Sequence, residues 1–311
     1  MSSGNVLFLV MLIMGPLISL SSTNWIICWI GLELGFLGLI PLLFSDLGFS
    51  SLSKESAMKY FCIQALASGL LMLGGTFVFI DFMTIWIFNF TFIMSLFMKL
   101  GIFPMHFWVP SVVSGLNWLP MFILLGWQKI PPLAFIVIFS ENLNWFTPFI
   151  MVFGGLSALA GSIIGLNQTS FRAMLGSSSI SHTGWACFGS VLGNLWVYFL
   201  IYFFTFLILM FFCFLVDDLM ISITVLSLSG LPPFTMFIGK WGILKSALIC
   251  EIWYIYLILP ILGALLSLFF YLKFFYSFYL KFTSINQKSK YSFITCFIFI
   301  FTSGVLTIMF F

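Results

Sequence analysis

Long apolar runs, separated by short polar connections, repeat along almost the whole chain. A run of about 20 apolar residues can cross a bilayer as a helix. The pattern predicts eleven spans, at residues 5–22, 24–44, 56–80, 84–108, 117–140, 146–167, 171–191, 194–216, 219–246, 252–280 and 291–310. The predicted fold is an all-α polytopic transmembrane helix bundle. We expect residues 1–311 to form a single domain, with no soluble domain.

Composition supports a membrane protein and excludes several function classes. The chain is 62% hydrophobic and only 6% charged, whereas soluble domains carry about 25% charged residues. The net charge of +3 includes no basic patch suited to nucleic acid. The six cysteines are scattered without a C-x-x-C pair, which argues against iron–sulfur clusters and structural zinc. No nucleotide-binding glycine motif is present.

Basic residues predict the orientation of the spans. If the N-terminus lies on one side, eleven spans place six basic residues on that side and Lys245 alone on the other. The six are Lys54, Lys59, Arg172, Lys281, Lys288 and Lys290. Basic loops face the cytoplasm or the matrix. We therefore expect the N-terminus on that side and the C-terminus opposite. The start of the chain lacks an Arg-rich presequence, so the first span is expected to be retained.

Two spans are predicted to be interrupted helices. The fourth carries Gly101 and Pro104, and the ninth carries Gly230, Pro232 and Pro233. The two breaks are five spans apart, so their helices run in opposite directions. Inverted repeats with matching broken helices are typical of transporters. Glycine and proline are also common in membrane helices, so the similarity of the two breaks does not by itself establish an inverted repeat.

Four charged side chains lie deep inside apolar spans: Glu33, Lys99, Lys129 and Lys240. Lys129 is near the middle of the fifth span, and we expect a helix break after it, at Pro131 and Pro132. A charge at the centre of a spanning helix costs roughly 2.5–3.5 kcal/mol on insertion scales. Such residues usually face a protein interior or a wet cavity and handle ions or protons. For Glu33 the structural alternative is a hydrogen bond between helices. For the lysines it is snorkelling to the interface, which is most plausible for Lys240.

The histidines and the remaining lysines are less informative. His182 lies in a hydroxyl-rich run, Ser177-Ser-Ser-Ile-Ser-His182-Thr, which could hold water between Lys129 and Lys240. A histidine titrating near pH 6.5 suits a proton relay, although a structural hydrogen bond is nearly as good an explanation. A structural role is favoured for His106, and snorkelling is favoured for Lys273.

Several of these segments, in order along nearly the whole chain, resemble the chain 2 family of NADH:ubiquinone oxidoreductase, respiratory complex I. They are Trp29-Ile-Gly-Leu-Glu33, Lys59-Tyr-Phe-x-x-Gln64, Lys99-Leu-Gly-x-x-Pro104-x-His106-Phe-Trp108-x-Pro110, Trp127-Gln-Lys-Ile-x-Pro132, Leu166-Asn-Gln-Thr169, Ser178-Ser-Ile-Ser-His182-x-Gly-Trp185 and Leu228-Ser-Gly-Leu-Pro-Pro233. Eleven spans fit the shortened animal form of this family. Its orientation, with the N-terminus in the matrix, agrees with the charge bias.

The resemblance implies roles by position. Glu33 and Lys99 match the family's carboxylate–lysine pair, Lys129 its central lysine, His182 the histidine that follows, and Lys240 the lysine of the second broken helix. Three departures put loop contacts in doubt more than this row: Gly35 stands where the family often has Asn, Ser111 where an acidic residue is frequent, and Ala173 where a second basic residue is frequent.

The function expected from this resemblance is proton translocation, in a complex that oxidises NADH and reduces ubiquinone in the mitochondrial inner membrane. The chain itself is expected to hold no redox centre. FMN, iron–sulfur clusters, NADH and ubiquinone would bind other subunits. Its partners would be other membrane-arm subunits and lipids. Two alternatives stay open, a subunit of a multisubunit cation/proton antiporter and a scaffold whose charges only join helices.

Overall fold

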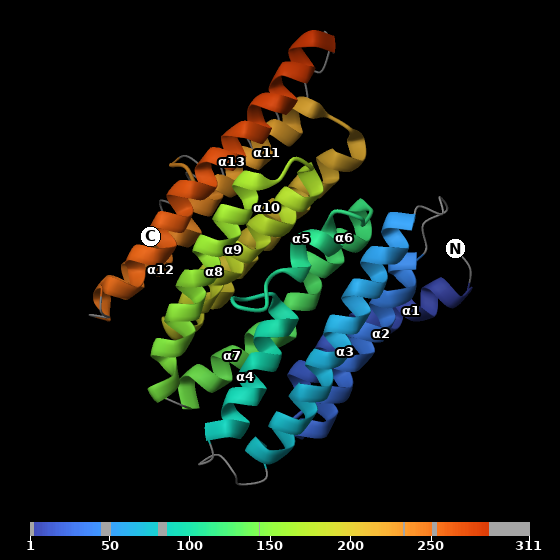
Figure 1. The fold of residues 1–311 in the computed structure, drawn as a ribbon, viewed down its shortest axis with the longest axis vertical. Helices are drawn as coiled ribbons and strands as arrows, with labels where there is room; N and C mark the ends of the chain where they lie inside the picture. The colour runs from blue at the N-terminus through green and yellow to red at the C-terminus, as the bar shows by residue number, and fades with distance from the viewer. Residues whose placement is uncertain are drawn as a thin grey trace. The chain divides into compact units, whose positions relative to one another are not determined.

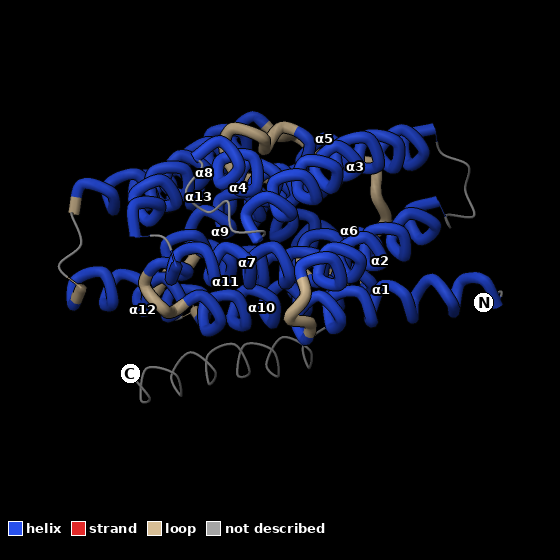
Figure 2. Tube along the Cα trace, turned by 90° about the horizontal axis from the view of Figure 1, so that it is seen from below, coloured by secondary structure: helices blue, strands red, loops and turns tan. Residues whose placement is uncertain are grey.

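The computed structural model describes residues 3–44, 51–79, 86–142, 144–232, 234–250 and 254–285. These parts are helical, with short turns and no strand among them (Figures 1 and 2). The all-α prediction is confirmed. The expected eleventh span, 291–310, and Pro233 lie outside the described residues. The chain divides into two compact units, Met1–Asn144 and Trp145–Phe311, which are described separately below.

The described residues of unit 1 form four long helices and three shorter ones. Helix α1 packs along α2, and α3 packs against both α2 and α4 (Figure 1). The bounds are α1 Ser3–Ser21, α2 Trp25–Phe44, α3 Ser51–Phe79, α4 Trp86–Leu100, α5 Trp108–Val113, α6 Trp118–Leu125 and α7 Ile130–Asn142. Glu33 and Lys99 therefore lie on α2 and α4, and Lys129 lies at the junction of α6 and α7.

The fourth expected span is interrupted after Leu100, where α4 ends. Gly101 takes a φ of +71°, and a Cβ there would collide with the Val109 side chain. Only glycine adopts that backbone conformation at little cost. The chain then turns until Trp108, so Lys99 lies in the last turn of α4.

The fifth expected span is interrupted at a different place from the prediction. We expected the break after Lys129, at Pro131 and Pro132. In the structure the interruption comes before the prolines, at Gly126 and the 3₁₀ turn Trp127–Lys129. Both prolines instead lie in the first turn of α7. Proline is tolerated there because the first helical N–H groups have no partner within the helix.

Unit 2 contains the remaining described helices. Helix α8 packs on α9 and α13, α10 packs on α11 and α12, and α11 packs on α13. The bounds are α8 Thr147–Asn167, α9 Phe171–Val191, α10 Leu195–Leu215, α11 Asp218–Ser229, α12 Thr235–Ile249 and α13 Ile255–Ile285. A 3₁₀ turn, Asn144–Phe146, precedes α8. The ninth expected span is therefore two helices: α11 ends at Ser229, Gly230 follows as its C-cap, and α12 begins at Thr235.

Helix α9 lies at the centre of unit 2, because every residue from Ala173 to Ser190 is buried. It approaches α8 closely through glycines. A Cβ on Gly184 would lie 2.5 Å from the Gly154 carbonyl oxygen, and one on Gly161 would lie 2.6 Å from the Ser181 nitrogen. Small residues let membrane helices pack backbone to backbone. This contact holds the segment that carries His182.

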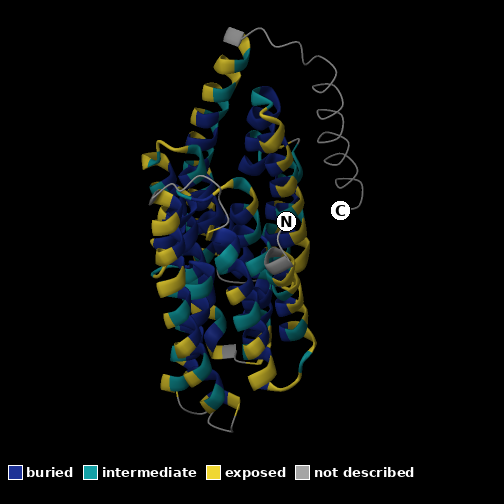
Figure 3. Ribbon diagram, turned by 90° about the vertical axis from the view of Figure 1, so that its right-hand side faces the viewer, coloured by how far each residue is buried: buried dark blue, intermediate teal, exposed yellow. Residues whose placement is uncertain are grey.

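Each of the first ten expected spans coincides with a helix or a pair of helices in the described residues. Six segments are both long and apolar enough to cross a membrane. They are Trp25–Phe44, Leu52–Phe79, Trp118–Asn142, Thr147–Asn167, Leu195–Leu215 and Ile255–Thr283. Exposed residues on the helices are often large and apolar, and they recur along the outward faces (Figure 3). Such faces suit contact with lipid or with other membrane proteins.

Candidate functional site

Glu33 of α2 and Lys99 of α4 form an ion pair inside unit 1. Lys99 Nζ lies 3.7 Å from Glu33 Oε1. The side chains are 6% exposed for the lysine and 18% for the glutamate. Glu33 Oε1 is closed off from solvent and accepts no hydrogen bond from the described residues. The lysine is therefore this oxygen's charge partner, at a distance just beyond a direct hydrogen bond.

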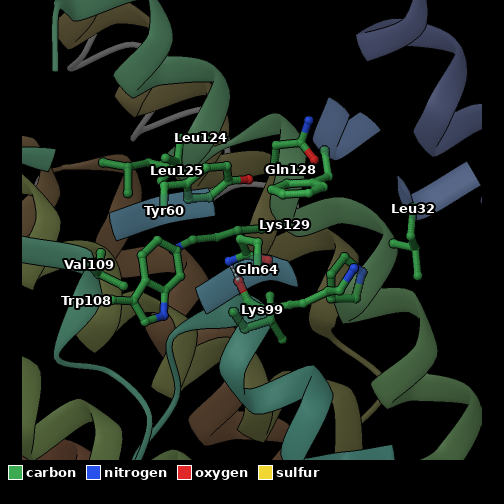
Figure 4. Close-up of a pocket in the computed structure, with 13 residues that line it drawn as sticks. Leu32, Tyr60, Gln64, Lys99, Trp108, Val109, Leu124, Leu125, Gln128 and Lys129 are labelled. Atoms are coloured by element: carbon green, nitrogen blue, oxygen red, sulfur yellow. Dashed lines mark hydrogen bonds between the residues drawn. The ribbon is translucent and has the colours of Figure 1, made fainter. Parts of the chain in front are cut away.

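A small cavity lies beside the pair and is also lined by Lys129 (Figure 4). Its volume is about 20 Å³, and a cavity of ~10–15 Å³ is enough for one water. The polar lining residues are Tyr60, Gln64, Lys99, Gln128 and Lys129. The apolar ones are Leu32, Phe36, Leu100, Trp108, Val109, Leu124, Leu125 and Pro132. The site therefore combines two lysines with room and hydrogen-bonding groups for water.

Two glutamine amides connect this cavity to the backbone of the helices that carry the pair. Gln64 Nε2 donates to the Lys99 carbonyl oxygen at 3.5 Å (Figure 4). Gln128 Nε2 donates to the Gly35 carbonyl oxygen at 2.9 Å. Gly35 is one of the three departures from the family pattern. The amide of Gln128 lies 3.4 Å from where a Cβ on Gly35 would be, so its side chain packs on this position.

His182 lies in unit 2 and is held by two phenols. Its Nδ1 is 2.9 Å from the Tyr198 hydroxyl of α10, and its Nε2 is 3.1 Å from the Tyr271 hydroxyl of α13. The ring of Tyr202 packs against the imidazole with centroids 4.9 Å apart. All four side chains are buried. Each ring nitrogen of the imidazole therefore has a buried hydroxyl as a hydrogen-bond partner.

The hydroxyl-rich run around His182 donates to its own helix. Ser177, Ser178, Ser181 and Thr183 each donate to a carbonyl three residues earlier, at 2.7–2.8 Å. Their lone pairs stay available as acceptors. The idea that this run holds water between Lys129 and Lys240 stays a prediction.

The Lys240 side chain reaches the break between α11 and α12. It is 8% exposed, and its Nζ donates to the Ser229 carbonyl oxygen at 2.7 Å. Ser229 is the last residue of α11, where carbonyls lack intrahelical partners. Gly230 follows with a φ of +78°, and a Cβ there would lie 2.9 Å from Lys240 Nζ. The ammonium is thus directed into the helix break within unit 2, which is not the geometry of snorkelling.

His106 and Lys273 occupy positions that fit structural roles. His106 is 2% exposed and packs against the rings of Phe103 and Phe107. Lys273 Nζ donates to the Gln168 carbonyl oxygen at 3.1 Å, just after the end of α8. A basic side chain at a helix C-terminus satisfies a carbonyl and the helix dipole.

The sequence reasoning missed Tyr198, Tyr271 and Gln128. Tyrosine usually marks the membrane interface, so Tyr271, well inside an expected span, was unusual, but the sequence did not indicate its partner. Gln128 stands next to Lys129, and no local pattern indicates that its amide binds the Gly35 carbonyl oxygen. Among the described residues, no three His, Cys, Asp or Glu side chains gather as a metal site would need.

The structure brings together Glu33, Lys99 and Lys129 in unit 1. In unit 2 it places Tyr198 in contact both with His182 and with α12: a Cβ on Gly239, which precedes Lys240, would lie 3.1 Å from Tyr198 Cδ2. Their part in proton transfer stays a prediction.

Known proteins match this chain along most of its length. The family described as NADH:quinone oxidoreductase/Mrp antiporter, transmembrane, matches residues 22–218. NADH-ubiquinone oxidoreductase chain 2 of Albinaria caerulea is 39% identical over 94% of this chain and 92% of its own length. The same protein of Anopheles gambiae is 37% identical over 89% and 86%.

Solved structures share the fold at lower identity. A chain of respiratory complex I from Thermus thermophilus has a TM-score of 0.72 at 20% identity, covering 85% of this chain and 68% of that one. A chain of the Mrp complex from Dietzia has a TM-score of 0.77 at 15% identity, covering 86% and 59%. The solved structures therefore support an antiporter-like fold, and the sequence relatives identify the protein family among those that share this fold. This chain belongs to the NADH-ubiquinone oxidoreductase chain 2 family.

Proposed function

We propose that this chain is a core membrane-arm subunit of mitochondrial NADH:ubiquinone oxidoreductase and that it takes part in proton translocation. The sequence relatives, 37–39% identical over most of the chain, support the first part. One observation carries the second part. The buried Glu33–Lys99 pair adjoins a water-sized cavity, which Lys99 shares with Lys129.

The chemistry begins with the charge on Lys99. The Glu33 carboxylate favours the ammonium form, while burial disfavours it. If Glu33 takes up a proton or moves away, the ammonium loses its partner and releases a proton to water in the cavity. Lys129 faces the same cavity and can accept that proton. Two buried ammonium groups around one small cavity repel each other more strongly than they would in bulk water, so charging one lysine favours discharge of the other.

We infer that His182 and Lys240 serve the same route within unit 2, where both are buried. Lys240 donates to the carbonyl at the end of α11, at an interrupted helix. Broken helices in transporters carry ion-handling groups in this way. In this proposal, residues 1–311 work as one antiporter-like domain.

In this proposal, other subunits of the complex carry out the redox chemistry. FMN, iron–sulfur clusters, NADH and ubiquinone would bind other subunits, and this chain would contribute only proton movement. Other membrane-arm subunits and lipids would cover its exposed apolar faces. The basic bias of one side supports an N-terminus in the matrix and a C-terminus in the intermembrane space.

The test uses assembled complex that carries Lys129→Met or Lys240→Met. We expect proton pumping driven by ubiquinone reduction to fall at least tenfold, while NADH oxidation with an artificial electron acceptor is unchanged. Lys245→Met is the matched control, because Lys245 lies on the same helix as Lys240 and is exposed. Pumping at the control level in both variants would contradict the proposed role of these lysines.

A further inference from the structure

The environment of His182 is more specific than a structural hydrogen bond requires. Its two ring nitrogens meet hydroxyls from two different helices, Tyr198 of α10 and Tyr271 of α13, at 2.9 and 3.1 Å. Both tyrosines are 1% exposed, and His182 is 3% exposed. A buried tyrosine hydroxyl usually finds one partner. Here two of them converge on one imidazole.

Hydroxyl partners suit an imidazole that changes its protonation state. Neutral imidazole has one N–H and one lone pair, whereas the protonated ring has two N–H groups. A phenol can accept from an N–H or donate to a lone pair simply by rotating its O–H bond. A backbone carbonyl could only accept, and an ammonium could only donate. With phenols on both sides, the ring keeps two hydrogen bonds with or without the extra proton.

Tyr198 also links this histidine to the helix that carries Lys240. Its ring packs on Gly239 of α12, where a Cβ would lie 3.1 Å from Tyr198 Cδ2. Gly239 immediately precedes Lys240, whose Nζ donates to the Ser229 carbonyl oxygen. Tyr198 therefore lies between the imidazole and α12. Tyr271 approaches the opposite ring nitrogen from α13.

Several titratable groups lie on α9 and on the helices packed against it. Helix α8 carries none. Those on the other helices packed against α9 are Tyr198, Tyr202 and Cys213 of α10, Lys240 and Lys245 of α12, and Tyr256, Tyr271, Lys273, Tyr276, Tyr279 and Lys281 of α13. On α9 itself they are Arg172 and Cys187. Among these groups, the hydroxyls of Tyr198 and Tyr271 lie within hydrogen-bond distance of the two ring nitrogens.

We propose that Tyr198 and Tyr271 are positioning residues that let His182 take up and release a proton, with Tyr198 on the Lys240 side. The proton comes from water and returns to water, and the two phenols keep their own protons. When the ring is protonated, both of its N–H groups donate to the phenol oxygens. When the ring loses that proton, one phenol turns its O–H toward the freed lone pair. This inference rests on the proposed proton-translocating function.

The experiment compares Tyr198→Phe and Tyr271→Phe in assembled complex with Tyr276→Phe as the control. Phenylalanine keeps the ring and removes only the hydroxyl. Tyr276 is an exposed tyrosine on α13, so its change removes the same atom elsewhere. Proton pumping per NADH oxidised is measured from acid to alkaline pH, with activities expressed per assembled complex.

Both variants should pump less, and the pH at which pumping is half lost on the alkaline side should move lower by about one unit. The pH moves lower because the protonated ring needs two hydrogen-bond acceptors, and a hydrogen bond to a charged group is stronger than one to a neutral group. Loss of one acceptor should weaken proton binding about tenfold, which corresponds to about one pH unit. The control should match the wild type.

Gly239→Ala offers a second route to the same site, since its methyl group presses on the Tyr198 ring without removing the hydroxyl. The pH of half-lost pumping should move in the same direction by a smaller amount. This variant tests the inference if a phenylalanine variant fails to assemble. Unchanged pumping in the tyrosine variants, with Lys240→Met still impaired, would overturn this inference and leave the proposed function standing. Equal loss at every pH would indicate packing alone and would also overturn it. Wild-type pumping in Lys240→Met and Lys129→Met would instead remove the proposed function itself.

Discussion

Replacing Glu33 by glutamine leaves the Lys99 ammonium buried without its charge partner. The two groups are 3.7 Å apart, and the lysine side chain is 6% exposed. At an effective dielectric constant of about 20, their attraction is about 4 kcal/mol. Removing one member of a buried pair typically costs ~3–5 kcal/mol, unless the survivor becomes neutral. Glu33→Gln should therefore either destabilise the site or discharge Lys99.

Either outcome removes the proposed charge switch without removing a helix. We expect Glu33→Gln and Lys99→Met each to lower coupled proton pumping at least tenfold, while the complex still assembles. Glu33→Asp should keep part of the activity, because it retains a carboxylate. Pumping and ubiquinone reduction are measured on purified complex, and assembly is followed on native gels.

The double variant provides the decisive comparison. If the two residues act as one unit, Glu33→Gln/Lys99→Met should lose about as much pumping as the worse single variant. Independent residues would give the product of the two losses, roughly a hundredfold. Contacting residues show coupling energies of about 0.5–3 kcal/mol, and 1 kcal/mol is about fivefold. Losses that simply multiply would refute the reasoning.

The exposed pair Glu55–Lys59 supplies a matched control within the same unit. Its charged atoms are closer, at 2.6 Å, but the lysine side chain is 45% exposed and that of the glutamate is 59% exposed. Exposed ion pairs contribute little, because water screens both partners. Glu55→Gln/Lys59→Met should pump like the wild type. A large loss there would mean that burial does not explain the effect at Glu33.

Three further predictions follow from close packing and from the absence of a soluble domain in the sequence pattern. Gly230→Ala should assemble but pump less than the wild type. The left-handed backbone costs alanine ~1–2 kcal/mol, and the alanine Cβ would lie 2.9 Å from Lys240 Nζ. Pumping at the wild-type level would contradict this. Gly184→Ala should lower the yield of assembled complex on native gels, because its Cβ would lie 2.5 Å from the Gly154 oxygen and overpacking costs ~1–3 kcal/mol. Native gels of mitochondrial membranes should show the chain only within a large complex, and a stable monomer that is still functional would count against that.

The helices themselves could be predicted from the sequence, because their cause is local. Each spanning helix satisfies its own backbone hydrogen bonds, so an apolar run of sufficient length predicts one directly. Gly101 and Gly230 were visible as sites of interruption, because glycine adopts positive φ at little cost. The charged side chains were visible because charge is rare in apolar spans. The resemblance of whole segments then indicated the family, which the sequence relatives confirm.

Tertiary structure decided which of these groups meet. Glu33 and Lys99 are far apart in sequence, and only the packing of α2, α3 and α4 brings them to 3.7 Å. The break beside Lys129 also depended on context, because Pro131 and Pro132 could either end a helix or begin one. The phenols on His182 come from two other helices, and their distance along the chain gave no signal. The length of an apolar run determines that a helix forms, whereas side-chain partners depend on how helices cross, which no local pattern encodes.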